Sequence, residues 1–218
     1  MTWHEIANDN IQGTPIIVTY CPLCGSGIAY EAYVDLNEIK TETRFGTSGK
    51  LYNSNLIMYD ELTDTYWQQI GGDAIIGELT GQRLTSIPLD TVVWRDFKDT
   101  KDALVLTQDT GISRNYGNDP YGDYFENSFL LFPVENEDDR IHPKTIVFGI
   151  ELDGNFKAYK EEDLIELTTI TDIIGDVEIT LTREDNGLIT VTPERAIKER
   201  DMWFAWYAFH PETLLYEN

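Results

Sequence analysis

The chain is built from short apolar runs that are separated by Gly, Asn and Asp turns. Residues 15–20 (PIIVTY) are apolar and rich in β-branched side chains, which predicts a buried strand. The turn Cys21-Pro22-Leu23-Cys24-Gly25 ends this run, and residues 28–33 are predicted to form the returning strand. The pattern therefore predicts a β-hairpin with two cysteines at its tip.

Similar runs continue along the rest of the chain and predict further strands. They lie at residues 41–47, 51–60, 66–70, 74–76, 83–87, 103–107, 145–152, 156–160, 177–182 and 188–192. One short helix is predicted over residues 91–98, because Asp90 is a suitable N-cap. Residues 202–209 (MWFAWYAF) are apolar at nearly every position but too few to span a membrane, so they are predicted to be a core element.

Residues 109–140 carry little periodic pattern and are rich in Gly, Pro, Asn, Asp and Tyr. A loop of this length inside a compact chain is commonly functional or disordered. Its many aromatic residues favour an ordered and packed loop. The run at 135–139 (ENEDD) is expected to be a solvated acidic turn.

Together these elements predict a mostly β fold, barrel-like or sandwich-like, with a few short helices. Residues 170–192 follow the same plan of strand, turn and returning strand as residues 5–33, although the second tip, at 183–187, has no cysteine. We therefore predict a single domain, 1–218, made of two related β-units. A thiol-bearing unit spans about 1–110, an ordered loop region 111–144, and the second unit 145–218.

Charge and motifs exclude several classes of function. The formal net charge is −23, from 39 acidic and 16 basic residues, which argues against nucleic acid and against an anionic membrane surface as partners. We expect no transmembrane segment, because no run approaches the roughly 18 apolar residues that a membrane span needs. No nucleotide cofactor is expected either, since Walker and Rossmann glycine patterns are absent from the sequence.

The two cysteines are the strongest candidates for chemistry. A Cys-Pro-x-Cys-Gly turn can place two thiolates at adjacent corners of a tetrahedral metal site. Further ligands could come from His4, His142 or His210, or from a carboxylate, and we favour a metal site of Cys21 and Cys24 with His4 or His210. Thiolates select soft or borderline ions, so zinc, copper and iron are the expected metals. No catalytic residue can be named.

Two other interpretations of the same turn stay open. A strand followed by Cys-Pro-x-Cys also occurs in thiol–disulfide oxidoreductases, which use a helix N-terminus to lower the pKa of the first thiol. Here Gly25 and the β-branched stretch that follows do not favour a helix. Alternatively, Cys21 and Cys24 could be a structural staple in an extracellular structural or interaction module.

Six segments carry a resemblance to a known family. They are residues 3–9 (WHEIAND), 20–25 (YCPLCG), 45–49 (FGTSG), 51–60 (LYNSNLIMYD), 119–125 (DPYGDYF) and 204–211 (FAWYAFHP). With these motifs the chain resembles the uncharacterised domain-of-unknown-function family numbered 3179, nearly from end to end. The resemblance implies no assigned activity, and because many relatives look secreted or lipid-anchored, it implies an extracytoplasmic or secreted location.

The same resemblance bears on the candidate ligands and on assembly. His4, Cys21, Cys24 and His210 all lie inside family motifs, which favours a common role for them. Family members usually carry an extra strand pair before the WHEIAND segment. A β-unit without those strands would have exposed edges, so a homo-oligomer formed by strand-edge pairing is expected.

Overall fold

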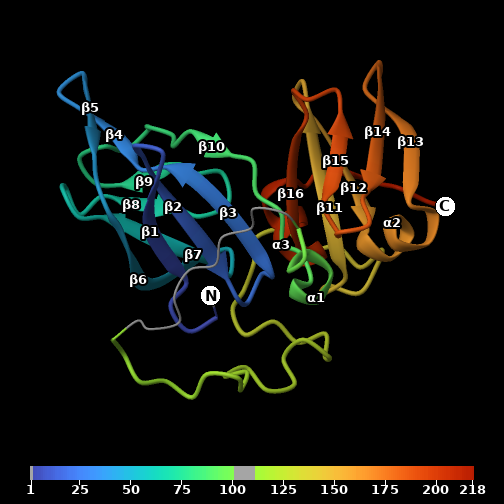
Figure 1. Cartoon of the computed structure of the whole chain (residues 1–218), viewed down its shortest axis with the longest axis horizontal. Coiled ribbons are helices and arrows are strands. Elements are labelled where there is room, and N and C mark those ends of the chain that lie inside the picture. The colour runs from blue at the N-terminus through green and yellow to red at the C-terminus, as the bar shows by residue number, and fades with distance from the viewer. Residues whose placement is uncertain (1, 101–110) are drawn as a thin grey trace.

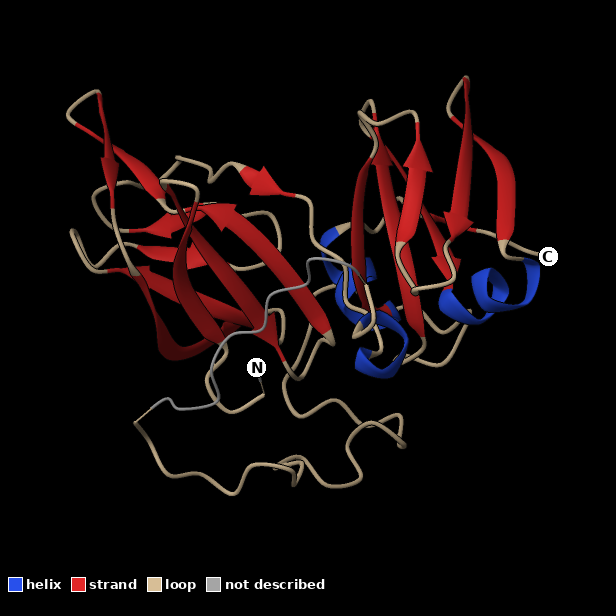
Figure 2. Ribbon diagram, in the orientation of Figure 1, coloured by secondary structure: helices blue, strands red, loops and turns tan. Residues whose placement is uncertain are grey.

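The computed structural model describes residues 2–100 and 111–218, and these residues form a mostly β protein of several packed sheets (Figures 1 and 2). The sheets are open in the described part of the chain, so the fold is sandwich-like and not a closed barrel. The predicted mostly β class is confirmed. The strand predicted at 103–107 lies outside the described residues.

The first β-unit, on the blue and green side of Figure 1, packs two four-stranded sheets around one core. One sheet has the order β1 (Ile6–Ile11), β2 (Thr14–Cys21), β3 (Ser26–Glu31) and β10 (Ser86–Ile87). The other has the order β6 (Phe45–Tyr52), β7 (Asn55–Asp60), β8 (Tyr66–Gln68) and β9 (Ala74–Ile76), and β4 (Tyr33–Leu36) pairs with β5 (Ile39–Glu42). Ile17, Met58 and Trp67 are fully buried between the sheets, because alternate strand positions face the core.

The second β-unit, on the orange and red side, has its own core. One sheet has the order β16 (Ile197–Met202), β11 (Ile146–Leu152), β12 (Asn155–Lys160) and β17 (Leu214–Leu215). The other is the meander β13 (Thr169–Ile174), β14 (Val177–Arg183) and β15 (Ile189–Thr192). The helices are α1 (Trp94–Phe97), α2 (Glu161–Leu167) and α3 (Trp203–Phe209).

Local corrections to the predicted elements have physical causes. The strand predicted at 51–60 is interrupted by a two-residue turn, because Asn53 and Ser54 both adopt left-handed backbone angles and Tyr52 pairs with Asn55. The helix predicted over 91–98 is shorter and spans Trp94–Phe97. Its N-cap is Val93 and not Asp90, and Val93 makes no side-chain capping hydrogen bond. Asp90 instead pairs with Lys198 of β16.

The core element predicted at 202–209 is the helix α3, and α2 was not predicted. The apolar run suited a helix or a strand equally well because it is apolar on every face. Five residues of α3 are buried. The indole ring of Trp206 packs directly over Gly149 of β11, so closely that a Cβ atom on residue 149 would lie 2.3 Å from the ring. Among the described residues, no helix has both the length and the apolar character needed to cross a membrane.

The loop region 111–144 contains no helix or strand and runs beneath both β-units in Figure 1. It is nonetheless packed. The Phe125 ring meets the rings of Tyr121 and Tyr124 edge-on, and all three residues belong to or pack against the first core. The ordered character of the region 111–144 stays a prediction, which these contacts support. The division into two related units stays a prediction, as does pairing between copies at sheet-edge strands such as β1.

Candidate functional site

The thiol turn lies where the sequence places it, between paired strands. β2 ends on Cys21, β3 begins on Ser26, and these two residues pair across the hairpin. The Cys24 amide donates to the Cys21 carbonyl at 3.1 Å, and Gly25 takes the left-handed angle (φ +65°) that closes the turn. The Met202 amide of β16 donates to the Cys24 carbonyl at 2.7 Å, so the turn is fixed to the second β-unit.

Both cysteines are reduced and buried, with exposed fractions of 2% for Cys21 and 0% for Cys24. Their sulfur atoms are 2.8 Å apart. This separation lies between the roughly 2.05 Å of a disulfide and the roughly 3.5–4 Å expected of two thiolates on one tetrahedral metal, from the Zn–S bond length. The pair is therefore arranged to form a bond between the two sulfur atoms after a small movement.

Polar groups of the β6–β7 turn surround the sulfur atoms. The Ser54 carbonyl oxygen lies 3.4 Å from the Cys24 Sγ and 3.9 Å from the Cys21 Sγ. The Asn55 side-chain amide donates to the Cys24 Sγ at 3.5 Å, and it also donates to the Gln69 Oε1 at 2.7 Å. Burial first, and then the neighbouring Cys21, raise the pKa of the Cys24 thiol well above its usual value. The folded site therefore favours the protonated, unreactive thiol.

The histidines predicted as ligands lie elsewhere. The His4 Nε2 is 2.6 Å from the Tyr116 hydroxyl, and its ring stacks on that tyrosine. His210 is packed between the rings of Phe156 and Trp206, and its burial there lowers its pKa to about 4. His142 accepts a hydrogen bond from the Lys144 amide. In the described part of the chain, no group of three or more His, Cys, Asp or Glu side chains could hold a metal ion.

The buried side chain of Lys144 holds part of the loop region over the thiol turn. The Lys144 Nζ donates to the Tyr124 carbonyl, to the Phe129 carbonyl at 2.6 Å and to the Asn127 Oδ1 at 3.1 Å. It also lies 3.6 Å from the centre of the Tyr124 ring. The Tyr124 hydroxyl in turn donates to the Leu23 carbonyl of the thiol turn at 3.0 Å. Lys144 therefore positions the aromatic loop on the two cysteines.

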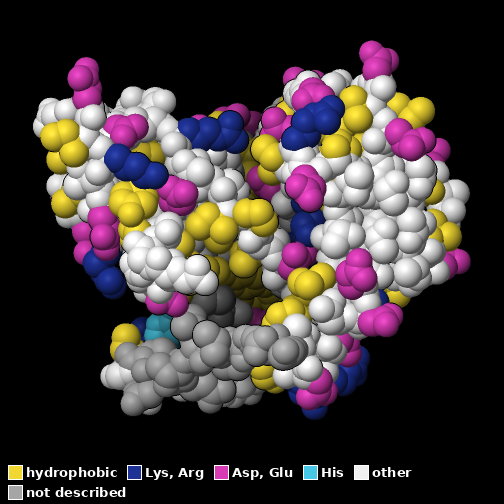
Figure 3. Space-filling view, turned by 45° about the horizontal axis from the view of Figure 1, so that its top comes forward, with side chains coloured by type: hydrophobic (Ala, Val, Ile, Leu, Met, Phe, Trp, Pro, Cys, Tyr) yellow, Lys and Arg dark blue, Asp and Glu magenta, His cyan; other side chains and the backbone are white. Residues whose placement is uncertain are grey.

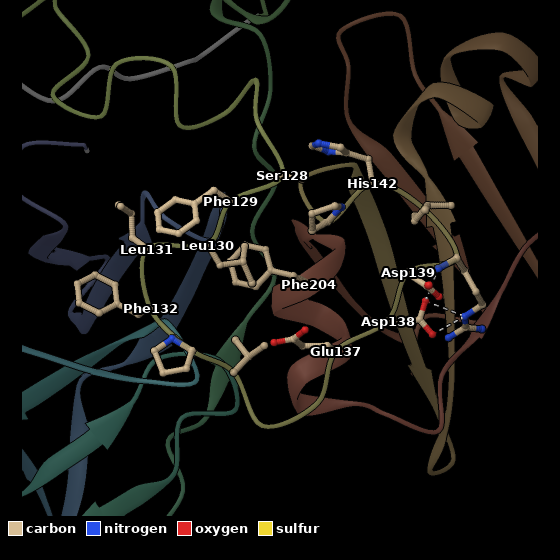
Figure 4. A pocket seen from close by; sticks show the side chains of 15 residues that line it. Ser128, Phe129, Leu130, Leu131, Phe132, Glu137, Asp138, Asp139, His142 and Phe204 are labelled. Atoms are coloured by element: carbon tan, nitrogen blue, oxygen red, sulfur yellow. Dashed lines mark hydrogen bonds and ion pairs between the residues drawn. The ribbon is translucent and has the colours of Figure 1, made fainter.

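A groove of about 1260 Å³ opens beneath the same loop (Figure 4). Figure 4 shows the apolar side chains of 129–132 along one wall, with Phe204 of α3 and Glu137 between that wall and the Asp138–Arg140 pair. Phe129 has an exposed fraction of 65%, and Leu131 and Phe132 each have 46%. Three neighbouring apolar side chains on one exposed wall are typical of an interaction surface and not of scattered surface residues.

Ser54 contacts both the groove wall and the thiol pair. The Ser54 hydroxyl donates to the Phe132 carbonyl at 3.3 Å, while the Ser54 carbonyl faces both sulfur atoms. Asn53, which precedes it, accepts a hydrogen bond from the Glu135 amide at 2.9 Å. The β6–β7 turn therefore lies between the cysteines and the groove and supports both.

Acidic groups form the rim of the groove. Asp138 pairs with Arg140 at 2.8 Å and accepts from the Trp203 indole at 3.1 Å. Partial burial works to raise the pKa of Asp138, but the hydrogen bonds and charge of Arg140 outweigh it and hold that pKa below its ordinary value. Within the described residues, Glu137 and Asp139 enter no ion pair. The rim therefore offers uncompensated negative charge.

These features define the class of the protein: a mostly β, multi-sheet protein with a buried dithiol turn and an apolar groove. By sequence, the chain belongs to the family described as "Protein of unknown function (DUF3179)", whose model matches residues 1–199. The predicted family membership is confirmed. No curated protein and no solved structure matches the chain.

Proposed function

We propose that this protein is an extracytoplasmic interaction module in which Cys21 and Cys24 form a structural staple, that is, a disulfide bond that stabilises the turn. The observation that carries the proposal is the pair of buried sulfur atoms 2.8 Å apart, which belongs to no three-residue cluster of metal ligands among residues 2–100 and 111–218. Oxidation joins the two sulfur atoms and releases two protons and two electrons to an oxidising disulfide such as glutathione disulfide. Such staples persist outside the reducing cytosol, which supports the extracytoplasmic location.

The geometry favours a staple over an exchange catalyst. After Cys24 the chain continues as strand β3 and not as a helix, so the helix N-terminus that lowers a thiol pKa in redox enzymes is not supplied. Both thiols are also closed off from solvent. A catalyst would need at least one exposed sulfur atom with a lowered pKa, whereas burial raises that of Cys24.

A soft metal ion is the second candidate, favoured by the convergence of both sulfur atoms on the Ser54 carbonyl oxygen. Zinc, copper or iron bound by Cys21 and Cys24 would need the sulfur atoms to move apart. It would also need His4 or His210 to leave its aromatic partners. Because the metal site requires these movements and the disulfide does not, we rank it second.

The interaction surface in this proposal is the groove, and its partner is a protein segment that combines apolar and basic side chains. The wall at 129–132 supplies apolar contacts, and the acidic rim with Glu137 and Asp139 supplies charge that a basic segment complements. The face in Figure 3 shows acidic side chains over both β-units, in keeping with the net charge of −23 that a basic segment would complement.

A peptide-binding measurement tests the groove. We expect a short fluorescein-labelled peptide of Lys, Leu and Trp to bind, and a matched peptide with Glu in place of Lys not to bind. Glu137→Gln with Asp139→Asn is expected to weaken binding about tenfold, and Phe129→Ser by about as much or more, because central aromatic contacts commonly contribute most. Fluorescence anisotropy at two salt concentrations measures both effects.

Ile39→Ser is the matched control for Phe129→Ser, because Ile39 has the same exposed fraction of 65% but lies in the distant β4–β5 hairpin. It should leave binding unchanged. Equal binding of the basic and acidic peptides, or equal losses in the Phe129 and Ile39 variants, would show that the groove is not the surface that recognises the segment.

A further inference from the structure

Strand β16 brings two carboxyl groups into the interface between the β-units. Glu199 and Asp201 are two residues apart, so both side chains leave the same face of the strand. β16 packs against β3 of the first unit, as Figure 1 shows near the middle of the molecule. Asp201 is fully buried, with an exposed fraction of 0%, and Ser26 on β3 is equally buried.

The oxygens of this cluster lack partners. Within the described residues, five buried side-chain oxygen atoms have no hydrogen-bond partner, and four of them belong to Ser26, Glu199 and Asp201. Ser26 is close enough for its hydroxyl to lower the pKa of Asp201, although the two groups make no hydrogen bond of good geometry. Buried polar atoms are nearly always satisfied, so four orphans in one place indicate a missing ligand.

Neighbouring charged groups do not neutralise the two carboxyls. Arg200 lies between them in sequence but pairs with Glu161 at 2.8 Å. Arg83, the other nearby cation, is largely exposed, pairs with Asp73 and donates to the Gly71 carbonyl. Glu151 adds negative charge near Glu199. Tyr30, which lies near both carboxyls, uses its hydroxyl to donate to the Gln69 carbonyl.

Electrostatics agrees with this interpretation. Burial, followed by the charges of Asp201 and Glu151, raises the pKa of Glu199 to about 8. Burial raises the pKa of Asp201 to about 6, against the influence of Ser26 and Arg200. Two carboxyls are held close to each other without a counter-charge. A bound cation would supply that charge and satisfy the four oxygens together.

We propose that Glu199, Asp201 and Ser26 bind a hard divalent cation, of the Ca²⁺ or Mg²⁺ class, between β16 and β3. The donors are oxygen atoms only, which these ions prefer and which soft metals do not. Because the donors come from both β-units, the ion would hold the units together. The site adjoins the thiol turn, since Ser26 pairs with Cys21 across the hairpin, but neither sulfur atom is among the proposed donors.

Thermal unfolding of the EDTA-treated full chain at neutral pH tests the proposal with CaCl₂ and MgCl₂ as separate additions. We expect one ion to stabilise the fold. At one hundred times its dissociation constant, it should raise the folding equilibrium constant about a hundredfold. Tb³⁺ is a second probe, because Tyr30 lies near both carboxyls and can sensitise its luminescence. One Tb³⁺ per chain is expected, displaced by the stabilising ion.

Glu199→Gln with Asp201→Asn should abolish the stabilisation and the Tb³⁺ signal. The matched control is Asp176→Asn with Glu178→Gln, an exposed acidic pair with the same spacing, which should change neither. Ser26→Ala keeps both charges and should weaken binding about tenfold, so the test does not depend on the double variant folding. A wild-type chain that none of these ions stabilises would overturn the proposal, as would a response that survives in the Glu199 and Asp201 variant.

Discussion

Replacing Lys144 by Met is expected to lower the free energy of unfolding by about 3 kcal/mol and to release the loop from the thiol turn. The substitution keeps the length of the side chain but removes the donor to the Tyr124 and Phe129 carbonyls and to Asn127. Each buried acceptor left without a partner costs about 1–3 kcal/mol. Removing a buried cation offsets part of that loss, since burial already lowers the pKa of Lys144.

The same variant shows whether the effect is confined to the loop region. Chemical denaturation gives the stability change. Limited proteolysis should cut first near residues 124–129 of the loop region, because these residues are the ones that Lys144 holds. Peptide binding to the groove should fall in parallel. The control is Lys50→Met, which removes an exposed lysine and should change stability by less than about 0.5 kcal/mol. If the Lys144 variant kept its stability and its groove, Lys144 would not be the anchor of the loop.

Closing the Cys21–Cys24 bond is expected to stabilise the oxidised protein by about 2 kcal/mol relative to the reduced protein. A disulfide across so short a loop removes little chain entropy, and the loop-closure relation gives about 2 kcal/mol for a loop of this size. For a chain of this length, that difference raises the melting temperature by about 4–8 °C. Calorimetry of the chain refolded with glutathione disulfide, compared with the chain refolded under reducing conditions, measures it.

Cysteine variants supply the control for this effect. Cys21→Ser and Cys24→Ser should each abolish the response to the oxidant, because a single thiol cannot close the bond within the chain. The stabilities of these variants in the thiol state provide the baseline for the comparison. A melting temperature that falls on oxidation would show that the turn cannot accept the disulfide without strain, and the staple would then be wrong.

The sequence predicted the hairpin and its thiol tip because the signals there are local. A β-branched run ends at Cys21, and Gly25 can adopt the left-handed angle that the turn requires. The turn at Asn53 and Ser54 could also have been found, since consecutive Asn and Ser residues between apolar runs favour such turns. It was hidden by the alternation on either side, which suggested one continuous strand from 51 to 60.

The partners of the thiol turn could not be predicted, because they come from distant parts of the chain. Lys144 and Tyr124 carry no motif that links them to Cys21, and the contact of Ser54 with both sulfur atoms depends on how β7 packs. His4 and His210 stood inside family motifs, yet each lies against aromatic rings. Motif membership identified residues that matter to the fold but not what they touch.

The paired carboxyls of β16 show the same limit. Alternation places Glu199 and Asp201 on one face from sequence alone, but only the packing of β16 on β3 reveals that this face is buried. A strand of alternating basic and acidic residues is most simply explained as a solvated surface. The loss of solvent and the unpartnered Ser26 make it a candidate site.

The most direct test of the account is to measure the thiol state and the metal content of one preparation of the folded chain. Because both thiols are buried in the folded chain, the oxidant is supplied while the chain refolds. After the same preparation is unfolded, reduced, refolded with glutathione disulfide and alkylated in denaturant, mass spectrometry should find no alkylated cysteine and the loss of two hydrogens. Elemental analysis of the same sample before oxidation should find no stoichiometric zinc, copper or iron. One such ion per chain, lost in the Cys21→Ser variant together with free thiols that resist oxidation, would contradict the staple and establish a metal site instead.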